Sequence, residues 1–389
     1  MSPFRLLCLS RTGTCLAAMA YAGALPVLIT AWGMDGATAG GVQASYNAAN
    51  AVALLLVSAL ADRVGARRVY LGAIWLAAGA AVLFAAFARS PASAMGLVAL
   101  MAAAQGAAYT PALMLVAEMV PPARRGGAFG SLLAAGSFGY LLSVLTALGG
   151  AALLDYRWGF ACCAVGPLLG AVAGTLALRR HPAAARPRPA AGERGGLAAA
   201  LFTPLSLLLT LGYAAHCWEL LGAWAWMPAF LAGALAPLGL APLLSGLVVA
   251  GAVHLAGTLA TLTVGRASDR WGRRPVLVAV ATLGALGSAS LGWSAAWGPW
   301  AAVAVAFAAS FFIVGDSGVL SAAMSEAVPP RHLGTALALR SILGFGAGTL
   351  SPVAFGLALD AGAGWGGGFL TLAAGGAVAA LAALCLRRR

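Results

Sequence analysis

Asp62-Arg63-Val64-Gly65-Ala66-Arg67-Arg68 is a short charged stretch between two long apolar runs of this chain. A second copy, Ser268-Asp269-Arg270-Trp271-Gly272-Arg273-Arg274, places its Asp-Arg pair 207 residues later. Glu118-Met119-Val120-Pro121-Pro122 likewise returns, 208 residues later, as Glu326-Ala327-Val328-Pro329-Pro330. Two motifs that recur at nearly the same offset indicate that the chain consists of two related halves.

Apolar residues dominate the composition. Hydrophobic residues make up 62% of the 389 positions and charged residues only 8%, whereas soluble domains carry roughly 25% charged residues. Apolar runs of about 20 residues, each long enough to cross the hydrocarbon core as a helix, recur along the whole sequence. The composition predicts an all-α membrane protein in contact with the lipid bilayer and excludes a soluble globular domain.

Charged and Pro- or Gly-rich breaks divide the apolar runs into twelve predicted spans. They are 14–33, 39–61, 69–88, 93–117, 127–151, 158–178, 202–231, 241–264, 275–294, 299–324, 335–357 and 366–386. The only long hydrophilic stretch follows the sixth span and is rich in Pro, Ala and Arg, a composition that cannot form a buried core. We expect an N-terminal six-helix bundle over 1–178, a cytoplasmic linker over 179–200 and a C-terminal six-helix bundle over 201–389.

The arginines indicate the orientation of the spans. The net charge is +13, and every basic residue is an arginine. If the N-terminus is cytoplasmic, twenty of the twenty-three arginines fall on the cytoplasmic side, as the positive-inside rule requires. We therefore expect both termini in the cytoplasm. The Arg-, Ala- and Gly-rich composition is typical of GC-rich bacterial genomes, which indicates a bacterial inner membrane.

Two alternatives concern these charges. Arg5 and Arg11 precede the first apolar run, a pattern that a cleaved signal peptide also shows. The internal repeat needs this run as a first span and favours the transmembrane interpretation. Nucleic-acid binding requires basic residues on one wettable face, whereas here they are distributed among loops, so we expect no nucleic-acid partner.

The charged stretches resemble the signature loop of the major facilitator superfamily, GxLaDRxGRR. Gly265 opens the second copy as that signature requires, and Ser58 replaces the glycine in the first copy. With the twelve spans, the resemblance covers essentially the whole chain. It implies two six-helix bundles related by a pseudo-two-fold axis, which alternately expose a solute site to either side of the membrane.

In the family this loop is thought to hold the cytoplasmic side shut. By resemblance, the latch comprises Asp62, Arg63, Gly65, Asp269, Arg270 and Gly272. The glycine permits a tight turn, and the carboxylate can approach a helix N-terminus or an arginine of a neighbouring loop. The alternative is that the arginines only determine the topology.

Two departures from the family's drug/proton antiporters stand in the first half. Those proteins carry an Arg three residues before a Gln-Gly pair in span 4, where this chain has Ala102 before Gln105-Gly106. Their Gly-Pro signature in span 5 is also missing from Gly136-Ser137-Phe138-Gly139-Tyr140. Proton-driven drug efflux is therefore disfavoured.

Span 7 carries His216, Glu219 and Trp226 at spacings of three and seven, which places them on one helical face. Ionisable residues are costly inside a membrane and are functional candidates by default. We expect this face to line the solute cavity, with His216 and Glu219 taking up and releasing a proton during transport. The alternative is a structural hydrogen bond between His216 and Glu219.

Asp316 in span 10 and Arg340 in span 11 are the other charges predicted inside the membrane. Adjacent spans make an ion pair between them one interpretation. The other is that Arg340 anchors an anionic substrate through its guanidinium fork. No acid or arginine falls inside the first six predicted spans, so we expect the second half to carry the ionic chemistry.

The first half offers uncharged polar residues. They are Tyr21 in span 1, Gln43, Asn47 and Asn50 in span 2, Gln105 and Tyr109 in span 4, and Tyr140 in span 5. Of these we assign Tyr21, Asn47 and Tyr109 to the substrate site, with helix–helix hydrogen bonding as the alternative.

These patterns favour a secondary transporter that moves a small solute, with an organic or inorganic anion and proton coupling as the leading hypothesis. The alternatives are efflux of lipophilic compounds and uptake of a transition metal or metal complex, the latter suggested by His216, Cys217, Glu219 and His254. Enzyme motifs such as HExxH or GxSxG do not occur in an interpretable context. We expect no enzymatic activity, no cofactor, no resident metal, and a functional monomer.

Overall fold

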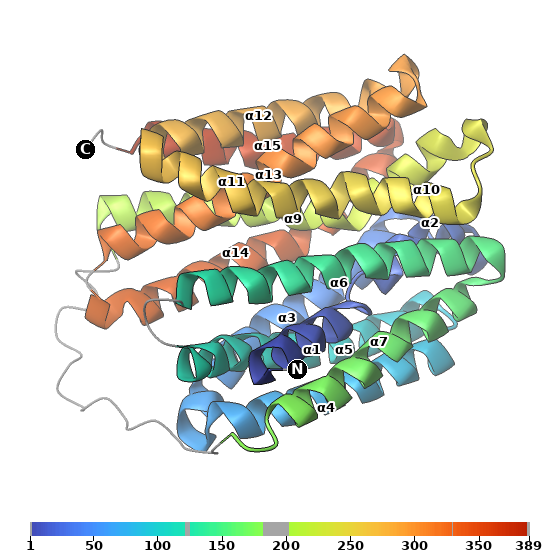
Figure 1. Cartoon of the computed structure of the whole chain (residues 1–389). Coiled ribbons are helices and arrows are strands. Elements are labelled where there is room, and N and C mark those ends of the chain that lie inside the picture. Colours follow the sequence, from blue (N-terminus) through green and yellow to red (C-terminus); the bar gives the residue numbers. More distant parts are fainter. Residues whose placement is uncertain (1, 121–124, 182–201, 329, 387–389) are drawn as a thin grey trace. The chain divides into compact units, whose positions relative to one another are not determined.

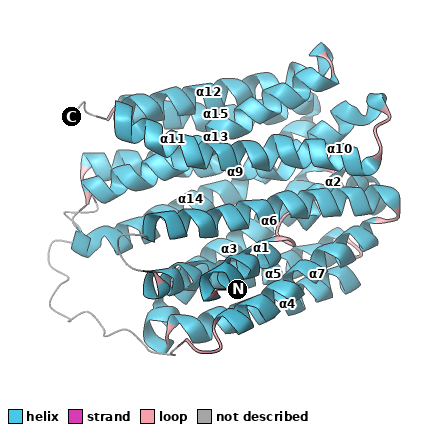
Figure 2. Ribbon diagram, in the orientation of Figure 1, coloured by secondary structure: helices cyan, strands magenta, loops and turns pink. Residues whose placement is uncertain are grey.

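The computed structural model describes residues 2–120, 125–181, 202–328 and 330–386. In this part of the chain the regular elements are helices, and no strand occurs among them (Figure 2). The predicted all-α architecture is therefore confirmed. The predicted linker, 179–200, lies almost entirely outside the described residues.

The chain divides into two compact units. The first comprises Met1–Met34, Gly41–Arg188 and Leu238–Leu255, and the second comprises Asp35–Gly40, Pro189–Pro237 and Ala256–Arg389. Two short segments, 35–40 and 238–255, thus group with the unit formed mainly by the opposite half of the chain. The bundle boundaries proposed from the sequence remain a prediction.

Helices from the first half of the chain make up most of the first unit. They are α1 (Pro3–Cys15), α2 (Ala20–Trp32), α3 (Gly36–Val64), α4 (Ala66–Phe87), α5 (Pro91–Met119), α6 (Arg125–Leu153) and α7 (Tyr156–Ala177). Helix α4 packs between α5 and α7, and α1 packs on α7 (Figure 1). The apolar core of this unit includes Tyr70, Ile74 and Leu115.

Helices from the second half make up the second unit, except for α10 and η3. The helices are α9 (Pro204–Leu235), α10 (Pro242–Ala250), α11 (Ala256–Trp271), α12 (Arg273–Ser294), α13 (Pro299–Ala327), α14 (Pro330–Ala358) and α15 (Gly364–Leu384). A π-helical turn, η3 (Gly251–Leu255), joins α10 to α11, and another, η5 (Leu359–Ala363), joins α14 to α15. Helix α12 lies beside α13 and α15, and α9 packs against α13, α14 and α15 (Figure 1).

The repeated loop has the same backbone geometry in both copies. Gly65 has a φ of 93° before α4, and Gly272 has a φ of 89° before α12. Residues with a Cβ rarely adopt such values, so both positions require glycine. The tight turns predicted at these glycines are confirmed.

The first span differs from its prediction in both length and continuity. Helix α1 begins at Pro3, where Ser2 caps its N-terminus by accepting a hydrogen bond from the Arg5 amide. The helical path then breaks at residues 16–19 and resumes as α2. The span therefore includes eleven residues that the sequence analysis assigned to the cytoplasm, Arg11 among them.

Ten stretches of the described residues are long and apolar enough to cross a membrane. One of them, Leu339–Leu384, contains most of α14 together with α15, and α3 is not among the ten. The amides Gln43, Asn47 and Asn50 lower the hydropathy of α3. The helices supply the elements that twelve crossings require, and the count of twelve remains a prediction.

Large apolar side chains cover much of the outer surface. Leu154, Leu169 and Trp271 are each more than half exposed. In water such surfaces would cause aggregation, whereas lipid is as apolar as these side chains. The surface is that of a multi-pass membrane protein.

Candidate functional site

His216 and Asp316 face each other inside the second unit. His216 lies in α9 and Asp316 in α13, and 2.6 Å separates His216 Nδ1 from Asp316 Oδ1. Both residues are at most 4% exposed. The two side chains therefore form a buried pair between α9 and α13.

Glu219 lies one turn along α9 from His216 but faces other helices. Ser288 Oγ of α12 donates a hydrogen bond to Glu219 Oε1 at 2.6 Å. Gly376 of α15 makes room for the carboxylate, since a Cβ at that position would lie 2.6 Å from Oε2. The Glu219 side chain is thus enclosed between α12 and α15.

These contacts correct both pairings that the sequence left open. Among the described side chains, His216 pairs with Asp316 and not with Glu219, and Asp316 does not pair with Arg340. The physical reason is that α9 packs against α13, α14 and α15 and also contacts α12 through Ser288. Residues on one stripe of it reach α13 and α12 at the same time, which a helical wheel cannot reveal.

Arg340 of α14 is buried against an aromatic ring. Its guanidinium carbon lies 3.9 Å from the centre of the Tyr213 ring, a cation–π contact between α14 and α9. Nη2 also donates to Ser321 Oγ of α13 at 3.2 Å. The Arg340 residue is only 6% exposed.

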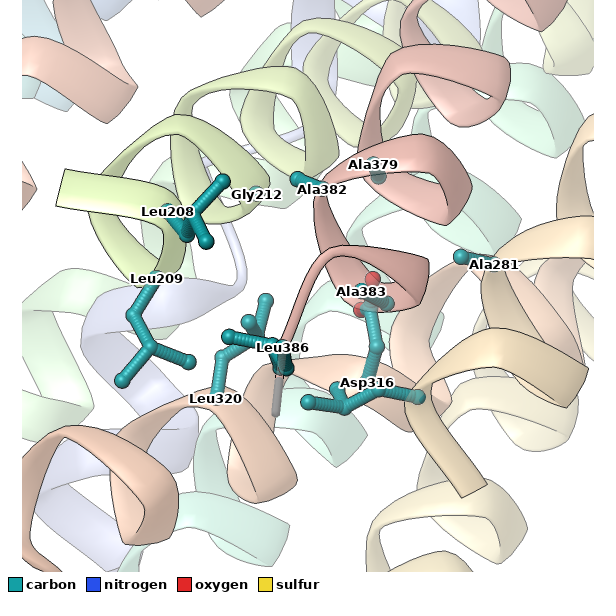
Figure 3. A pocket seen from close by; sticks show the side chains of 11 residues that line it. Leu208, Leu209, Gly212, Ala281, Asp316, Leu320, Ala379, Ala382, Ala383 and Leu386 are labelled. Atoms are coloured by element: carbon teal, nitrogen blue, oxygen red, sulfur yellow. The ribbon is translucent and has the colours of Figure 1, made fainter. Parts of the chain in front are cut away.

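Asp316 also borders a small pocket inside the second unit (Figure 3). The pocket is otherwise lined by apolar residues or glycine: Leu208, Leu209, Gly212, Leu277, Ala281, Leu320, Ala379, Ala382, Ala383 and Leu386. Its volume of about 10 Å³ has room for one water molecule at most. Asp316 is the only ionisable residue among those lining it.

Trp226 lies in an aromatic cluster. Its ring stacks on Phe355 with 5.0 Å between centroids and an interplanar angle of 13°. Nε1 donates to the Pro352 carbonyl at 3.0 Å. Trp365 and Phe230 continue the cluster. The structure thus gives Trp226 a packing role, and contact with substrate remains a prediction.

Arg11 is a buried charge in the first unit that the sequence analysis assigned to the cytoplasm. It is only 8% exposed, and its guanidinium lies over the Tyr109 ring at 5.2 Å. The structure places Arg11 in a helix that begins at Pro3, whereas the predicted first span began at residue 14. A signal existed in the sequence, because Ser2-Pro3 is a helix start that places Arg11 two turns inside the helix.

The uncharged polar residues of the first unit form hydrogen-bonded links. Tyr46 Oη donates to Gln105 Oε1 at 2.7 Å, and Gln105 Nε2 donates to the Thr14 carbonyl at 3.1 Å. Gln43 Nε2 lies 3.4 Å from Asn47 Oδ1. Gln105 thus ties α5 to α3 and to the last turn of α1.

Tyr21 and His254 have separate surroundings. Tyr21 is buried in α2, with its hydroxyl 3.8 Å from Met34 Sδ. His254, in η3, is buried with its ring 6.0 Å from that of Tyr140. The structure places Tyr140 near Arg11.

The second copy of the predicted latch forms an ionic cluster. Arg273 Nη1 lies 2.6 Å from Asp269 Oδ1, and Arg273 Nη2 lies 2.9 Å from Glu326 Oε1 at the end of α13. Asp269 is thus close to an arginine, as the loop chemistry predicts, while Arg270 is exposed. The side chains of Asp62 and Arg63 lie outside the described residues.

No group of three or more His, Cys, Asp or Glu residues is placed to hold a metal ion in the described parts of the chain. Of the residues that suggested metal uptake, His216 and Glu219 contact different partners. His216 contacts Asp316, Glu219 contacts Ser288, and His254 lies in the first unit.

Comparison with known families agrees with the repeated loop and the helical architecture. The sequence model described as Major Facilitator Superfamily matches residues 7–252 and 213–389. The chain belongs to the major facilitator superfamily. As a superfamily member it is a multi-pass membrane transporter of a small solute. No curated protein matches it significantly.

Solved structures of superfamily members have the same fold. A nucleoside transporter, NupG, in a D323A mutant form, aligns with a TM-score of 0.76 and 16% identity over 98% of both chains. A bacterial homologue of the human lysosomal transporter Spinster, in an inward-facing and unoccupied conformation, gives 0.76 and 16% over 98% of this chain and 95% of that one. Unmutated NupG gives 0.72 and 17% over 99% and 98%. The TM-scores show that these proteins share a fold with this chain, and at identities this low the comparison shows the fold alone.

Proposed function

We propose that this transporter moves a small organic or inorganic anion across the bacterial inner membrane, by alternating access and with proton coupling. The observation that carries the proposal is the buried contact between His216 and Asp316. A proton coupled to transport needs a buried group that changes protonation during the cycle. An imidazole next to a carboxylate is suited to that task because histidine changes charge near neutral pH.

Two carboxyl groups inside the second unit are candidates for the proton site. Asp316 lies next to the imidazole of His216 and borders a pocket with room for about one water molecule. Glu219 accepts a hydrogen bond from the Ser288 hydroxyl, and its carboxylate lies against Gly376. The imidazole and the adjacent pocket favour Asp316, because a proton carrier needs both an exchange partner and a path.

Arg340 supports an anionic solute. Its guanidinium is buried against the Tyr213 ring and donates to Ser321, two neutral partners. A carboxylate or phosphate on the solute fits the fork of donors that a guanidinium presents.

Thermal stability of the purified protein against a ligand panel tests the substrate class. The panel holds small carboxylates, inorganic phosphate and sulfate, nucleosides, lipophilic cations and divalent metals, at mildly acidic and at neutral pH. Binding to the folded state raises the midpoint of unfolding. We expect an oxyanion to raise it in the wild type and not in Arg340→Gln.

Arg266→Gln is the matched control, because Arg266 is an exposed arginine of the same unit. It should respond to ligand like the wild type. If only nucleosides, lipophilic cations or metals raise the midpoint, the anionic class is wrong.

A further inference from the structure

Arg11 is a buried cation without a buried counter-charge. It lies within the apolar stretch Pro3–Trp32, at 8% exposure. Among the side chains that the structure describes, no carboxylate lies within 4.0 Å of its guanidinium. An arginine inside a membrane protein is costly and is retained where it serves a function. Tyr109 provides a cation–π contact, which offsets only part of that cost.

A glycine and neutral side chains surround Arg11. Gly136 of α6 lies directly beside it, and a Cβ there would come 3.1 Å from Arg11 Nε. Tyr140, Tyr109 and Cys15 are among the groups near it. They are neutral groups, and the two tyrosines carry hydroxyls of the kind that donate to an anion.

A break in the helix lies just beyond Arg11. Helix α1 ends at Cys15 and α2 begins at Ala20, so the first span is discontinuous within its length. Side chains satisfy backbone groups on either side, since Gln105 donates to the Thr14 carbonyl and Ser143 Oγ accepts from the Met19 amide. In secondary transporters, broken helices line the solute and coupling-ion sites.

We propose that Arg11, with the hydroxyls of Tyr109 and Tyr140, forms an oxyanion-binding subsite in the first unit. The group it takes is the carboxylate or phosphate of the transported solute, whose two oxygens match the guanidinium fork. The proposal rests on the proposed function to the extent that the cargo is an anion. It adds Arg11 to the anion-binding residues. It also places part of the site in the first unit, whereas Arg340 belongs to the second.

Binding of defined probes to the full-length protein in detergent tests the subsite. The probes are acetate, succinate, inorganic phosphate and sulfate, with chloride as an anion that lacks the fork-matched oxygens. The proteins are wild type, Arg11→Gln and Arg11→Lys, with Arg89→Gln as the control. Arg89 is a first-unit arginine at the surface that bonds only to nearby carbonyls.

We expect the oxyanion that binds the wild type to bind Arg11→Gln about tenfold or more weakly, because a charge-assisted hydrogen bond is lost. Arg11→Lys keeps the charge without the fork and should fall between them. Arg89→Gln should match the wild type. Carboxylates and phosphates in separate arms show which oxyanion the subsite prefers.

The outcomes separate the two proposals. If an oxyanion binds wild type and Arg11→Gln equally, the subsite is overturned while the anionic function stands. If no oxyanion binds the wild type, the anionic function fails and the subsite fails with it. If Arg11→Gln does not fold, labelling of wild-type Arg11 by phenylglyoxal gives the answer. The bound oxyanion should lower labelling of the Arg11 peptide, and unchanged labelling overturns the proposal.

Discussion

His216 Nδ1 and Asp316 Oδ1 lie 2.6 Å apart between α9 and α13, and both side chains are buried. The two residues are a hundred positions apart in a chain with few charges. Each places a polar group opposite the other in an apolar interior. The pair links the packing of two helices to the protonation of one site.

Loss of either partner should destabilise the protein strongly. We expect Asp316→Asn and His216→Gln each to lower the free energy of unfolding by about 3–5 kcal/mol, because the remaining group stays buried without its partner. The double variant should lose at least about 1 kcal/mol less than the sum of the two. Denaturant unfolding in mixed micelles measures all three.

Arg157→Gln is the control for this cycle. Arg157 forms an exposed pair with Asp155 at 3.6 Å, and its loss should cost about 1 kcal/mol or less. Strict additivity of the two buried substitutions would show that His216 and Asp316 do not interact.

A substitution at Gly170 of α7 tests whether α1 and α7 pack closely against each other. A Cβ at this position would lie 2.8 Å from the Ser10 carbonyl oxygen and 2.9 Å from the Thr14 amide nitrogen. Backbone atoms cannot move aside without shifting the helix, so Gly170→Ala should cost about 1–3 kcal/mol. The readout is the midpoint of thermal unfolding.

Gly79→Ala is the matched substitution, because nothing lies within 4 Å of a Cβ there. It should leave the midpoint unchanged or raise it slightly, since alanine favours helix more than glycine does. Equal effects at Gly170 and Gly79 would mean that α1 and α7 are not in close contact.

The sequence predicted the fold well and the pairings within the site poorly. The all-helical fold, and the tight turns at Gly65 and Gly272, follow from apolar run length and from a repeated motif, which are local properties. The partners of His216, Glu219 and Arg340 depend on how α9 packs against four other helices, which no local pattern contains. The sequence analysis did not predict that Arg11 is a buried residue of α1, although a helix-start signal at Ser2-Pro3 preceded it.

Substitutions of Trp226 test whether this residue serves in packing or in substrate contact. Trp226→Ala should lower stability by about 3–5 kcal/mol, because it removes a large buried ring from an aromatic cluster. Trp226→Phe keeps the stacking on Phe355 and loses only the bond to the Pro352 carbonyl. We expect the phenylalanine variant to transport at the wild-type rate in proteoliposomes. A large loss of transport with intact stability would assign Trp226 to the solute site.

Arg273 tests the latch in the second half. Its partners Asp269 and Glu326 are exposed, so Arg273→Gln should cost at most about 1–2 kcal/mol for the two pairs. If the cluster controls the conformational cycle, the same substitution should change the transport rate severalfold. Flux measured in proteoliposomes, together with unfolding, separates these effects, and Arg266→Gln is the exposed control. Unchanged flux would leave the loop with a topological role only.

Proton movement driven by an anion gradient tests the central claim most directly. Proteoliposomes carry a pH-sensitive dye inside, and the oxyanion that most stabilises the protein is added outside. We predict that the wild type acidifies the interior as the anion enters, and that Asp316→Asn exchanges labelled anion across the membrane without acidification. Anion entry without acidification in the wild type, or equal acidification by Asp316→Asn, would contradict proton coupling through the His216–Asp316 pair.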